Sequence, residues 1–563
     1  MKKIIIVLGL IVTAFSSCNN YIEEESLTNV PADATYKTAS GFQLLVNSNY
    51  ATLKNIYGGT PWLFSSGTDM YAEGRTAEPA GLSQYSGLIS SSKDVEQLYK
   101  SCYQAIQSVN KTIYYSKITE QNDNIPTLVA EAKFIRANAY FLLVQTYGGV
   151  PIVDDNITSA ILSFDRNSAQ EVYAHIIKDL EESLAAVGTG TYATTGKVNK
   201  RAVQDLLAKV YLTRGYEAFG TTTDFTTAST YAEAAIAGQA LNVATDQLFK
   251  PGNDLNAETI FSVQYDKAST STNPGTLGNS QFYYFGPYLG GSETNGAPLR
   301  SYNLCPTAYT LGLYEKGDKR WAANFMTQIF EYTKPVNGKA TVILYVPFYD
   351  GTIAPTDANL KVRHFYEPKW FTATDKTNYL ATTRLAATFK YHAWGTYDAA
   401  HTLVDNTDCA TIPLKKFDDP DPTTPIGTAN SNLVSTRDIV VSRLAETYLI
   451  AAEAYLKAGN PTTGLDRLNE VRRRAGVANA TAAEFNINYI LDERGRELIG
   501  EYKRWFDLKR TGTLIDRAST YNYKIKAVNF DGKNGEKKIL RPIPQLALDL
   551  NQNKNFPQNP AYN

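Results

Sequence analysis

Residues 492–510 read DERGRELIGEYKRWFDLKR and form the most tightly patterned stretch of the chain. Leu491, Leu498, Tyr502 and Trp505 recur at i, i+7, i+11 and i+14, which predicts one continuous helix with a single apolar stripe. The stripe needs a core to pack against. Charged residues flank it at i,i+3 spacing, and we expect them to form exposed ion pairs, namely Arg494–Glu497, Glu501–Arg504 and Asp507–Arg510.

Two glycines, Gly495 and Gly500, lie inside this predicted helix. Each costs about 1 kcal/mol relative to alanine in a helix interior. A sequence accepts that cost where another segment passes close to the backbone. We therefore expect the helix to be packed on several sides and to have a structural role.

Further helices are predicted before this stretch. Apolar residues recur at helical spacing and are bounded by caps, prolines and glycines, as at Ser168 and Glu171, which form a capping box. The predicted helices cover residues 31–57, 95–118, 128–147, 168–187, 203–210 and 228–237. Because short turns join them, we expect stacked antiparallel pairs.

The clearest pair covers residues 442–475, where Gly459, Asn460 and Pro461 supply a stop, a cap and a first-turn proline. Its length of roughly 34 residues is the period of a tetratricopeptide repeat, although the full repeat consensus is absent. Stacked pairs of this kind predict an elongated superhelix with one continuous core.

Between residues 260 and 438 the composition shifts to Gly, Pro, Thr, Asn and Tyr, and runs such as TVILYVPFY indicate short strands. A stretch of this length is too long to be one loop, so we expect a second, irregular subdomain on the helical frame. The predicted organisation is a signal peptide, a tether, an N-terminal helical part, a loop-rich ligand-facing part and a C-terminal helical part with the tail. Their boundaries are 1–17, 18–30, 31–259, 260–438 and 439–563.

The N-terminus reads as a secretion signal, with Lys2 and Lys3 before a short apolar run that ends at Phe15. The run is too short to span a bilayer. Phe15-Ser16-Ser17-Cys18 is similar to a relaxed lipobox, which predicts lipidation at Cys18; an ordinary signal peptide with an incidental cysteine is the alternative. Acyl chains would then hold the protein at the membrane.

Composition excludes some functions and favours others. The formal net charge of −1 provides no long-range field for nucleic acid. The chain has 38 tyrosines, whose flat apolar face and polar tip suit wet binding surfaces.

After Cys18 only three cysteines remain, so at most one disulfide can form, and we favour Cys305–Cys409 over the pairs with Cys102.

The sequence offers little sign of catalytic chemistry. It has no HExxH, GxSxG, Walker or GxGxxG motif, and we expect each of the four histidines to be a lone structural or surface group. Asp418, Asp419 and Asp421 could hold calcium, but the prolines among them do not match an EF-hand loop, so we predict no cofactor. A surface glycoside hydrolase, which needs two carboxylates across a cleft, is the distant alternative.

Candidate ligand residues lie where aromatic and polar side chains meet glycine and proline. The tryptophans Trp62, Trp321 and Trp505 are assigned to the frame instead. The candidates are Asp69, Tyr71 and Arg75 in a first loop, Tyr283, Tyr284 and Tyr288 in a second, and Trp370 and Trp394. Two or three aromatic stacks and a few hydrogen bonds would contribute roughly 4 to 8 kcal/mol, which corresponds to millimolar to micromolar affinity.

Four stretches in order resemble the SusD/RagB family of Bacteroidota outer-membrane lipoproteins. They are EAKFIRANAYFLLVQTYGGVPIV from Glu131, RLAETYLIAAEAYLKAG from Arg443 with LNEVRRRAG from Leu468, ERGRELIGEYKRWFDLKR from Glu493, and RPIPQLALDLNQNKNFPQNPAY from Arg541. In the last, apolar residues replace the usual acidic residue after PIPQ, and Ala561 replaces the usual glycine; both changes concern packing of the tail. The acidic run Glu23–Glu25 is similar to the tag that sends such lipoproteins to the outer face of the cell.

This resemblance implies a mainly α fold, in which tetratricopeptide-like helix pairs form a right-handed superhelix that carries a loop-rich subdomain with short strands. It also implies a surface-exposed outer-membrane lipoprotein without enzymatic activity that captures oligosaccharides for a SusC-like TonB-dependent barrel. A RagB-like peptide-binding subunit of the same kind of transporter is the alternative. The family's ligand residues lie outside the shared motifs, so the candidates above rest on residue chemistry alone.

Overall fold

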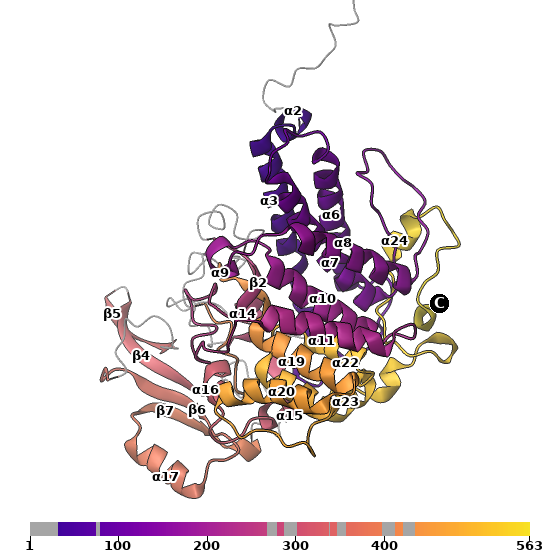
Figure 1. The fold of residues 1–563 in the computed structure, drawn as a ribbon. Helices are drawn as coiled ribbons and strands as arrows, with labels where there is room; N and C mark the ends of the chain where they lie inside the picture. The colour runs from indigo at the N-terminus through magenta and orange to yellow at the C-terminus, as the bar shows by residue number, and fades with distance from the viewer. Residues whose placement is uncertain are drawn as a thin grey trace, which may run out of the picture.

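Figure 1 shows the computed structural model of the chain. It describes residues 32–74, 79–266, 278–286, 301–336, 338–345, 356–396, 411–419 and 434–563. The prediction of a mainly α fold with a few short strands is confirmed.

The frame consists of antiparallel helix pairs. Neighbouring helices in the chain pack against each other, as α7 does on α8, α10 on α11 and α19 on α20, and α11 packs on α19 so that distant pairs stack. The main helices are α3 (Ala39–Tyr57), α6 (Lys93–Tyr115), α7 (Ile125–Tyr147), α8 (Ala169–Ala186), α10 (Lys200–Arg214), α11 (Thr222–Ile236), α19 (Leu444–Lys457) and α20 (Pro461–Ala475). A short helix, α2 (Ala32–Tyr36), precedes α3, so the predicted helix over 31–57 is in fact two helices.

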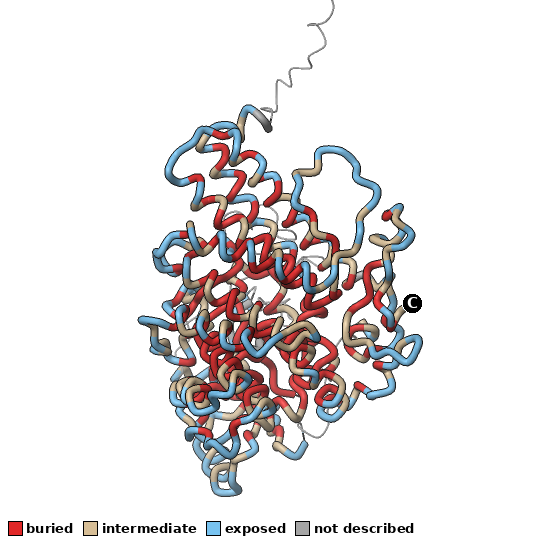
Figure 2. The backbone as a smooth tube through the Cα atoms, turned by 45° about the vertical axis from the view of Figure 1, so that its right-hand side comes forward, coloured by how far each residue is buried: buried red, intermediate tan, exposed pale blue. Residues whose placement is uncertain are grey.

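Local signals set several helix ends as predicted. Ser168 and Glu171 form the capping box that starts α8. Asn460 caps α20 with Pro461 in its first turn, and Gly459 takes a left-handed φ of 85° in the turn before it. The buried backbone is concentrated in the middle of the molecule, where these helices pack (Figure 2). Among the described helices, none combines the length and apolar character needed to cross a bilayer.

The loop-rich region contains a four-stranded sheet at the lower left of Figure 1. Its strand order is β5-β4-β6-β7, and β6 and β7 run parallel because α17 (Ala373–Thr382) connects them. The strands are β4 (Gln328–Val336), β5 (Lys339–Tyr345), β6 (Lys361–Tyr366) and β7 (Leu385–His392). Elsewhere β2 (Thr259–Val263) pairs with β8 (Ile439–Arg443), so the chain leaves and rejoins the helical frame at adjacent points.

The single helix predicted over 492–510 is wrong. The structure has α21 (Ile487–Glu497) and α22 (Arg504–Arg510), separated by a turn. In that turn Gly500 has a φ of +76°, and a Cβ built on it would lie 2.3 Å from the Phe417 ring. The inference of close packing around the glycines is therefore correct, but at Gly500 the glycine ends a helix instead of lying within one.

The charged residues of this stretch are buried, which also contradicts the prediction of exposed pairs. Glu493 is enclosed by Arg320 (2.6 Å), Arg472 (2.9 Å) and Arg496 (2.7 Å). Burial alone would raise the pKa of Glu493, but Arg320, Arg496 and Arg472 lower it to about 2. Only the predicted Asp507–Arg510 pair forms (3.0 Å), and it too is buried.

Arg443 extends this network to the β2–β8 ladder. Its guanidinium donates to Glu501 at 2.7 and 2.8 Å and to Glu497 at 2.6 Å. Removing one partner of a buried ion pair commonly costs about 3–5 kcal/mol. Residues 492–510 therefore stabilise the fold mainly through buried ion pairs with residues far away in the sequence.

Candidate ligand-binding site

Two candidate tyrosines lie side by side on the short helix α14 (Gln281–Phe285). Gln281, Phe282 and Phe285 of this helix are buried, whereas Tyr283 and Tyr284 are only half-buried. Positions i, i+1 and i+4 thus face the core, and the two positions between them face outward. The QFYYF sequence therefore leaves part of each of two neighbouring aromatic rings at the surface, while Tyr284 also packs against the main core.

Trp62 of α4 (Trp62–Ser65) supports this pair from behind. Its ring meets Tyr284 edge to face with centroids 4.9 Å apart, and Tyr284 meets Tyr283 in the same way at 5.1 Å. Such pairs contribute about 0.5–1.5 kcal/mol beyond the area they bury. Trp62 is 7% exposed, which agrees with its assignment to the frame. We call Trp62, Tyr283 and Tyr284 the aromatic cluster.

One polar group, the Asp94 carboxylate, acts electrostatically on Tyr284 of the aromatic cluster, although no residue of the cluster lines the recess next to Asp94. The Thr60 hydroxyl donates to Asp94 at 3.1 Å, and both residues line a small recess of about 30 Å³ together with Gln97. Burial raises the pKa of Tyr284 to about 12, with Tyr283 and Asp94 adding to the effect, so its phenol is neutral at physiological pH. Apolar ring faces can stack on a sugar ring, and a carboxylate such as that of Asp94 can accept hydrogen bonds from its hydroxyls.

Thr60, Asp94 and Gln97 were not among the residues predicted from sequence. Asp94 lies in the first turn of α6, where an acidic residue also suits the helix end, so its sequence position gave no sign of a site.

Asp69 and Tyr71 belong to the core, which corrects their selection as ligand residues. Asp69 is fully buried, and its carboxylate accepts from Arg504 at 2.6 and 2.7 Å and from Arg517 at 3.0 Å. Tyr71 is 3% exposed and packs edge to face on Phe285 at 5.3 Å. Neither side chain has surface left for a ligand, and Tyr71 instead supports α14.

Trp370 and Trp394 are half-buried and pack against the main core. Trp370 meets Trp321, which is 6% exposed, edge to face at 5.3 Å. Among the described residues, no ring contact joins either tryptophan to the aromatic cluster. The structure therefore brings Tyr283 and Tyr284 together, whereas Trp370 and Trp394 lie outside the aromatic cluster.

Several predictions fall on residues that the structure does not describe. They are Cys18, Arg75, Tyr288, His401, Cys409 and Asp421. The Cys305–Cys409 disulfide and lipidation at Cys18 thus stay predictions.

The described histidines and aspartates give no metal site. Asp418 and Asp419 are buried, and Asp419 accepts from Ser435 at 2.5 Å. Within the described residues, no three His, Cys, Asp or Glu side chains are grouped to hold a metal ion. His364 of β6 and His392 of β7 are not lone groups as expected, because both are buried and their ring nitrogens lie 3.0 Å apart.

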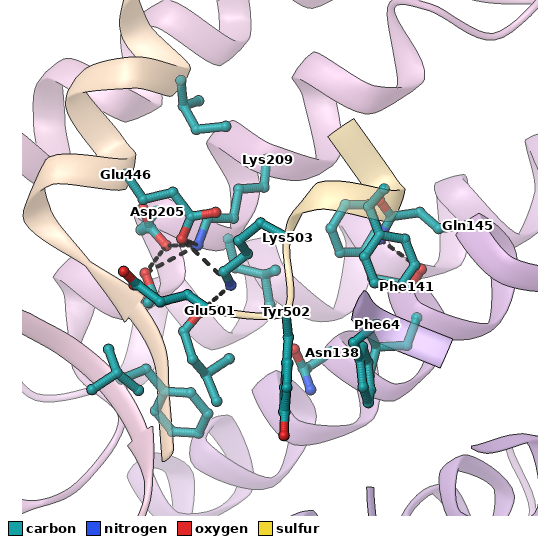
Figure 3. A pocket seen from close by; sticks show the side chains of 18 of the residues that line it. Phe64, Asn138, Phe141, Gln145, Asp205, Lys209, Glu446, Glu501, Tyr502 and Lys503 are labelled. Atoms are coloured by element: carbon teal, nitrogen blue, oxygen red, sulfur yellow. Dashed lines mark hydrogen bonds and ion pairs between the residues drawn. The ribbon is translucent and has the colours of Figure 1, made fainter. Parts of the chain in front are cut away.

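An internal cavity of about 80 Å³ lies between the helices and is lined by buried charges (Figure 3). Lys209 contacts Asp205 (2.8 Å) and Glu446 (2.7 Å), and Lys503 lies 3.5 Å from Glu446. Burial alone would raise the pKa of Glu446, but Lys209, Lys503 and Arg494 lower it to about 2. A carboxylate held ionised in this way is a poor general acid, and the cavity has room for a few water molecules at most. Because its charges pair with one another, we do not select this cavity as the ligand site.

Comparison with known proteins agrees with the fold. A family model described as the SusD family matches residues 257–562, more than half of the chain, and one described as starch-binding and associating with the outer membrane matches residues 20–212. The SusD-like protein P25 of Formosa agariphila is 24% identical, covering 98% of this chain and 97% of that protein. The starch-binding protein SusD of Bacteroides thetaiotaomicron is 25% identical, covering 77% of this chain and 72% of that protein.

A solved structure described as a laminarin-binding SusD-like protein superposes with a TM-score of 0.64 at 22% identity, covering 94% of this chain and all of that one. At this identity the superposition supports the fold alone. The match of the family model over residues 257–562 carries the assignment. The chain therefore belongs to the SusD family.

Proposed function

We propose that this protein is a lipid-anchored binding protein of the outer cell surface that captures oligosaccharides and passes them to a TonB-dependent outer-membrane barrel. Membership of the SusD family supports glycan binding, as do relatives described as starch-binding and laminarin-binding. The anchor would be at Cys18, ahead of a tether that ends near α2. The transfer partner is inferred from the family resemblance.

The observation that carries this proposal is the outward-facing ring pair of the aromatic cluster. Tyr283 and Tyr284 are held by a buried face of α14 and by Trp62, so their exposed surfaces are available without rearrangement. Two stacked rings and a few hydrogen bonds give roughly 4 to 8 kcal/mol. That range means millimolar to micromolar dissociation constants, which suit a protein that must release its cargo. Trp370 and Trp394, which are also half-buried, stay individual candidates outside the aromatic cluster.

Calorimetry tests the proposal on a soluble chain that starts after Cys18 and keeps every described residue. We expect a malto-, laminari- or other oligosaccharide of a broad panel to bind, and the Tyr283→Ala/Tyr284→Ala variant to bind about tenfold or more weakly. Tyr114→Ala is the matched control, because Tyr114 is 47% exposed on α6 outside the cluster. The double variant should stay folded and melt somewhat below the wild type, because it loses two ring contacts, whereas Tyr114→Ala should melt close to the wild type.

Three outcomes would count against the proposal. One is that only peptides bind, which would favour the peptide-binding alternative. Another is equal glycan affinity in the double variant and the wild type, which would move the site away from α14. A third is release of sugar products during the incubation, which would indicate a hydrolase.

A further inference from the structure

A second pocket, of about 220 Å³, lies in the helical frame. It is bounded by the turn that leads into α9 (Tyr192–Thr195), the first turn of α10, the chain after α11 and the start of β2. None of the residues of the aromatic cluster lines it. The lining includes Tyr192, Asn199, Arg201, Gln239 and Thr259, and no carboxylate.

Arg201 has an unusual environment. It is half-buried, and it is the one arginine among the described residues that makes no hydrogen bond, ion pair or ring contact there. Burial lowers its pKa, and no acidic neighbour opposes that effect. By contrast, the buried Arg320, Arg443 and Arg504 each pair with a carboxylate.

The position of Arg201 makes its charge costly in the unliganded protein. It is the second residue of α10, where the helix dipole disfavours a cation. Partial burial also removes water from the Arg201 guanidinium, and no group among the residues that the structure describes replaces the lost hydrogen bonds. An anion bound in the pocket would offset both costs, and a guanidinium is suited to hold a carboxylate through two parallel hydrogen bonds.

The other lining groups indicate what accompanies the anion. The Gln239 side-chain amide makes no hydrogen bond within the described residues, so it can bond a hydroxyl of the ligand. The Asn199 side chain accepts from Ala202 N and donates to Gly190 O, and the Tyr192 hydroxyl donates to Ser262 O, so these bonds hold both side chains in place. A volume of 220 Å³ is below the usual range for drug-sized ligands, roughly 300–1,000 Å³.

We propose that this pocket binds one carboxylate-bearing sugar unit, such as a uronic acid, with its carboxylate on Arg201. This inference goes beyond the proposed function because it assigns a second site, with a different chemistry, in the helical frame. Neutral sugars would bind here only weakly, since they leave the guanidinium without a counter-ion.

Ligand-observed NMR titration of the soluble chain with glucuronate, glucose and inorganic sulfate tests the proposal. We expect saturable binding of glucuronate, glucose binding weaker by about tenfold or more, and a similar loss of glucuronate affinity in Arg201→Ala. Lys200→Ala is the matched control, because Lys200 is the exposed neighbouring residue and its removal changes the net charge equally. The melting temperature of unliganded Arg201→Ala should equal or exceed that of the wild type.

Several results would overturn the inference. They are no saturable glucuronate binding to the wild type, equal binding of glucose and glucuronate, and equal losses in the Arg201 and Lys200 variants. Sulfate that binds as well as glucuronate would show that the pocket recognises charge alone, and the assignment to a sugar would fail. Oligosaccharide binding at the aromatic cluster, measured on the same proteins, should be unchanged by Arg201→Ala.

Discussion

Replacing Asp69 by asparagine tests the buried charge network directly. The carboxylate accepts three hydrogen bonds, two from Arg504 and one from Arg517, with no exposed surface. Asparagine has nearly the same shape but no charge, and its amide group would face guanidinium donors. Arg517 keeps Asp492 as a partner, whereas no other ion pair is found for Arg504 in the described part of the chain.

The expected cost of Asp69→Asn follows from this difference. One buried cation loses its counter-ion, which typically lowers the free energy of unfolding by about 3–5 kcal/mol. Burial alone would raise the pKa of Asp69, but Arg504 and Arg517 lower it below its ordinary value. Since the folded pKa is depressed, the carboxylate stabilises the fold fully above its unfolded pKa of about 3.9, and this stabilisation is lost as pH falls through the folded value.

Urea unfolding followed by tryptophan fluorescence measures this cost. At pH 7 the midpoint of Asp69→Asn should be well below that of the wild type, and the difference should shrink as the pH falls below about 4. Asp123→Asn is the matched control, because Asp123 is exposed and should change stability by less than about 0.5 kcal/mol. An unchanged midpoint combined with lost glycan binding would refute the reasoning and restore Asp69 as a ligand residue.

Two further substitutions test the packing of the same region. Gly500→Ala should lower the free energy of unfolding by about 1–3 kcal/mol, because the φ of +76° disfavours a side chain and Phe417 occupies the space that a Cβ would need. An unchanged midpoint in urea unfolding would contradict this prediction. The fully buried guanidinium of Arg541 lies 4.9 Å from the Tyr85 ring centroid and 4.8 Å from that of Trp505. Arg541→Lys should therefore lower the free energy of unfolding by about 1–2 kcal/mol and alter Trp505 fluorescence. Wild-type stability and an unchanged spectrum would show that a compact ammonium stabilises the fold equally well.

Features set by neighbouring residues could be predicted from the sequence. The capping box at Ser168 and Glu171 and the turn at Gly459, Asn460 and Pro461 depend on residues a few positions apart, and they form as expected. The outward-facing pair Tyr283 and Tyr284 was also selected, because aromatic residues beside glycine and proline are hard to bury.

Features set by distant partners could not be predicted. Asp69 was predicted to be a ligand residue in a loop, because its partner Arg504 is 435 positions away and no local pattern links the two. The pattern at residues 492–510 suited an amphipathic helix with exposed charges, since nothing local shows that Arg320 and Arg443 approach from other segments. Arg201 also went unnoticed, because its lack of partners is visible only when the surrounding elements are in place.

The buried charges and the candidate site are physically connected. Asp69 follows α4, which carries Trp62, and its ion pair with Arg504 fixes that segment to α22. Two residues further on, Tyr71 packs on Phe285 and so supports α14 from the core side. Bidentate ion pairs in a dry interior tolerate little displacement. The segment that carries Trp62 and the helix α14 are therefore both held in place before a ligand arrives. Such preorganisation reduces the entropic cost of binding, which a site with only two partly exposed rings needs in order to reach useful affinity.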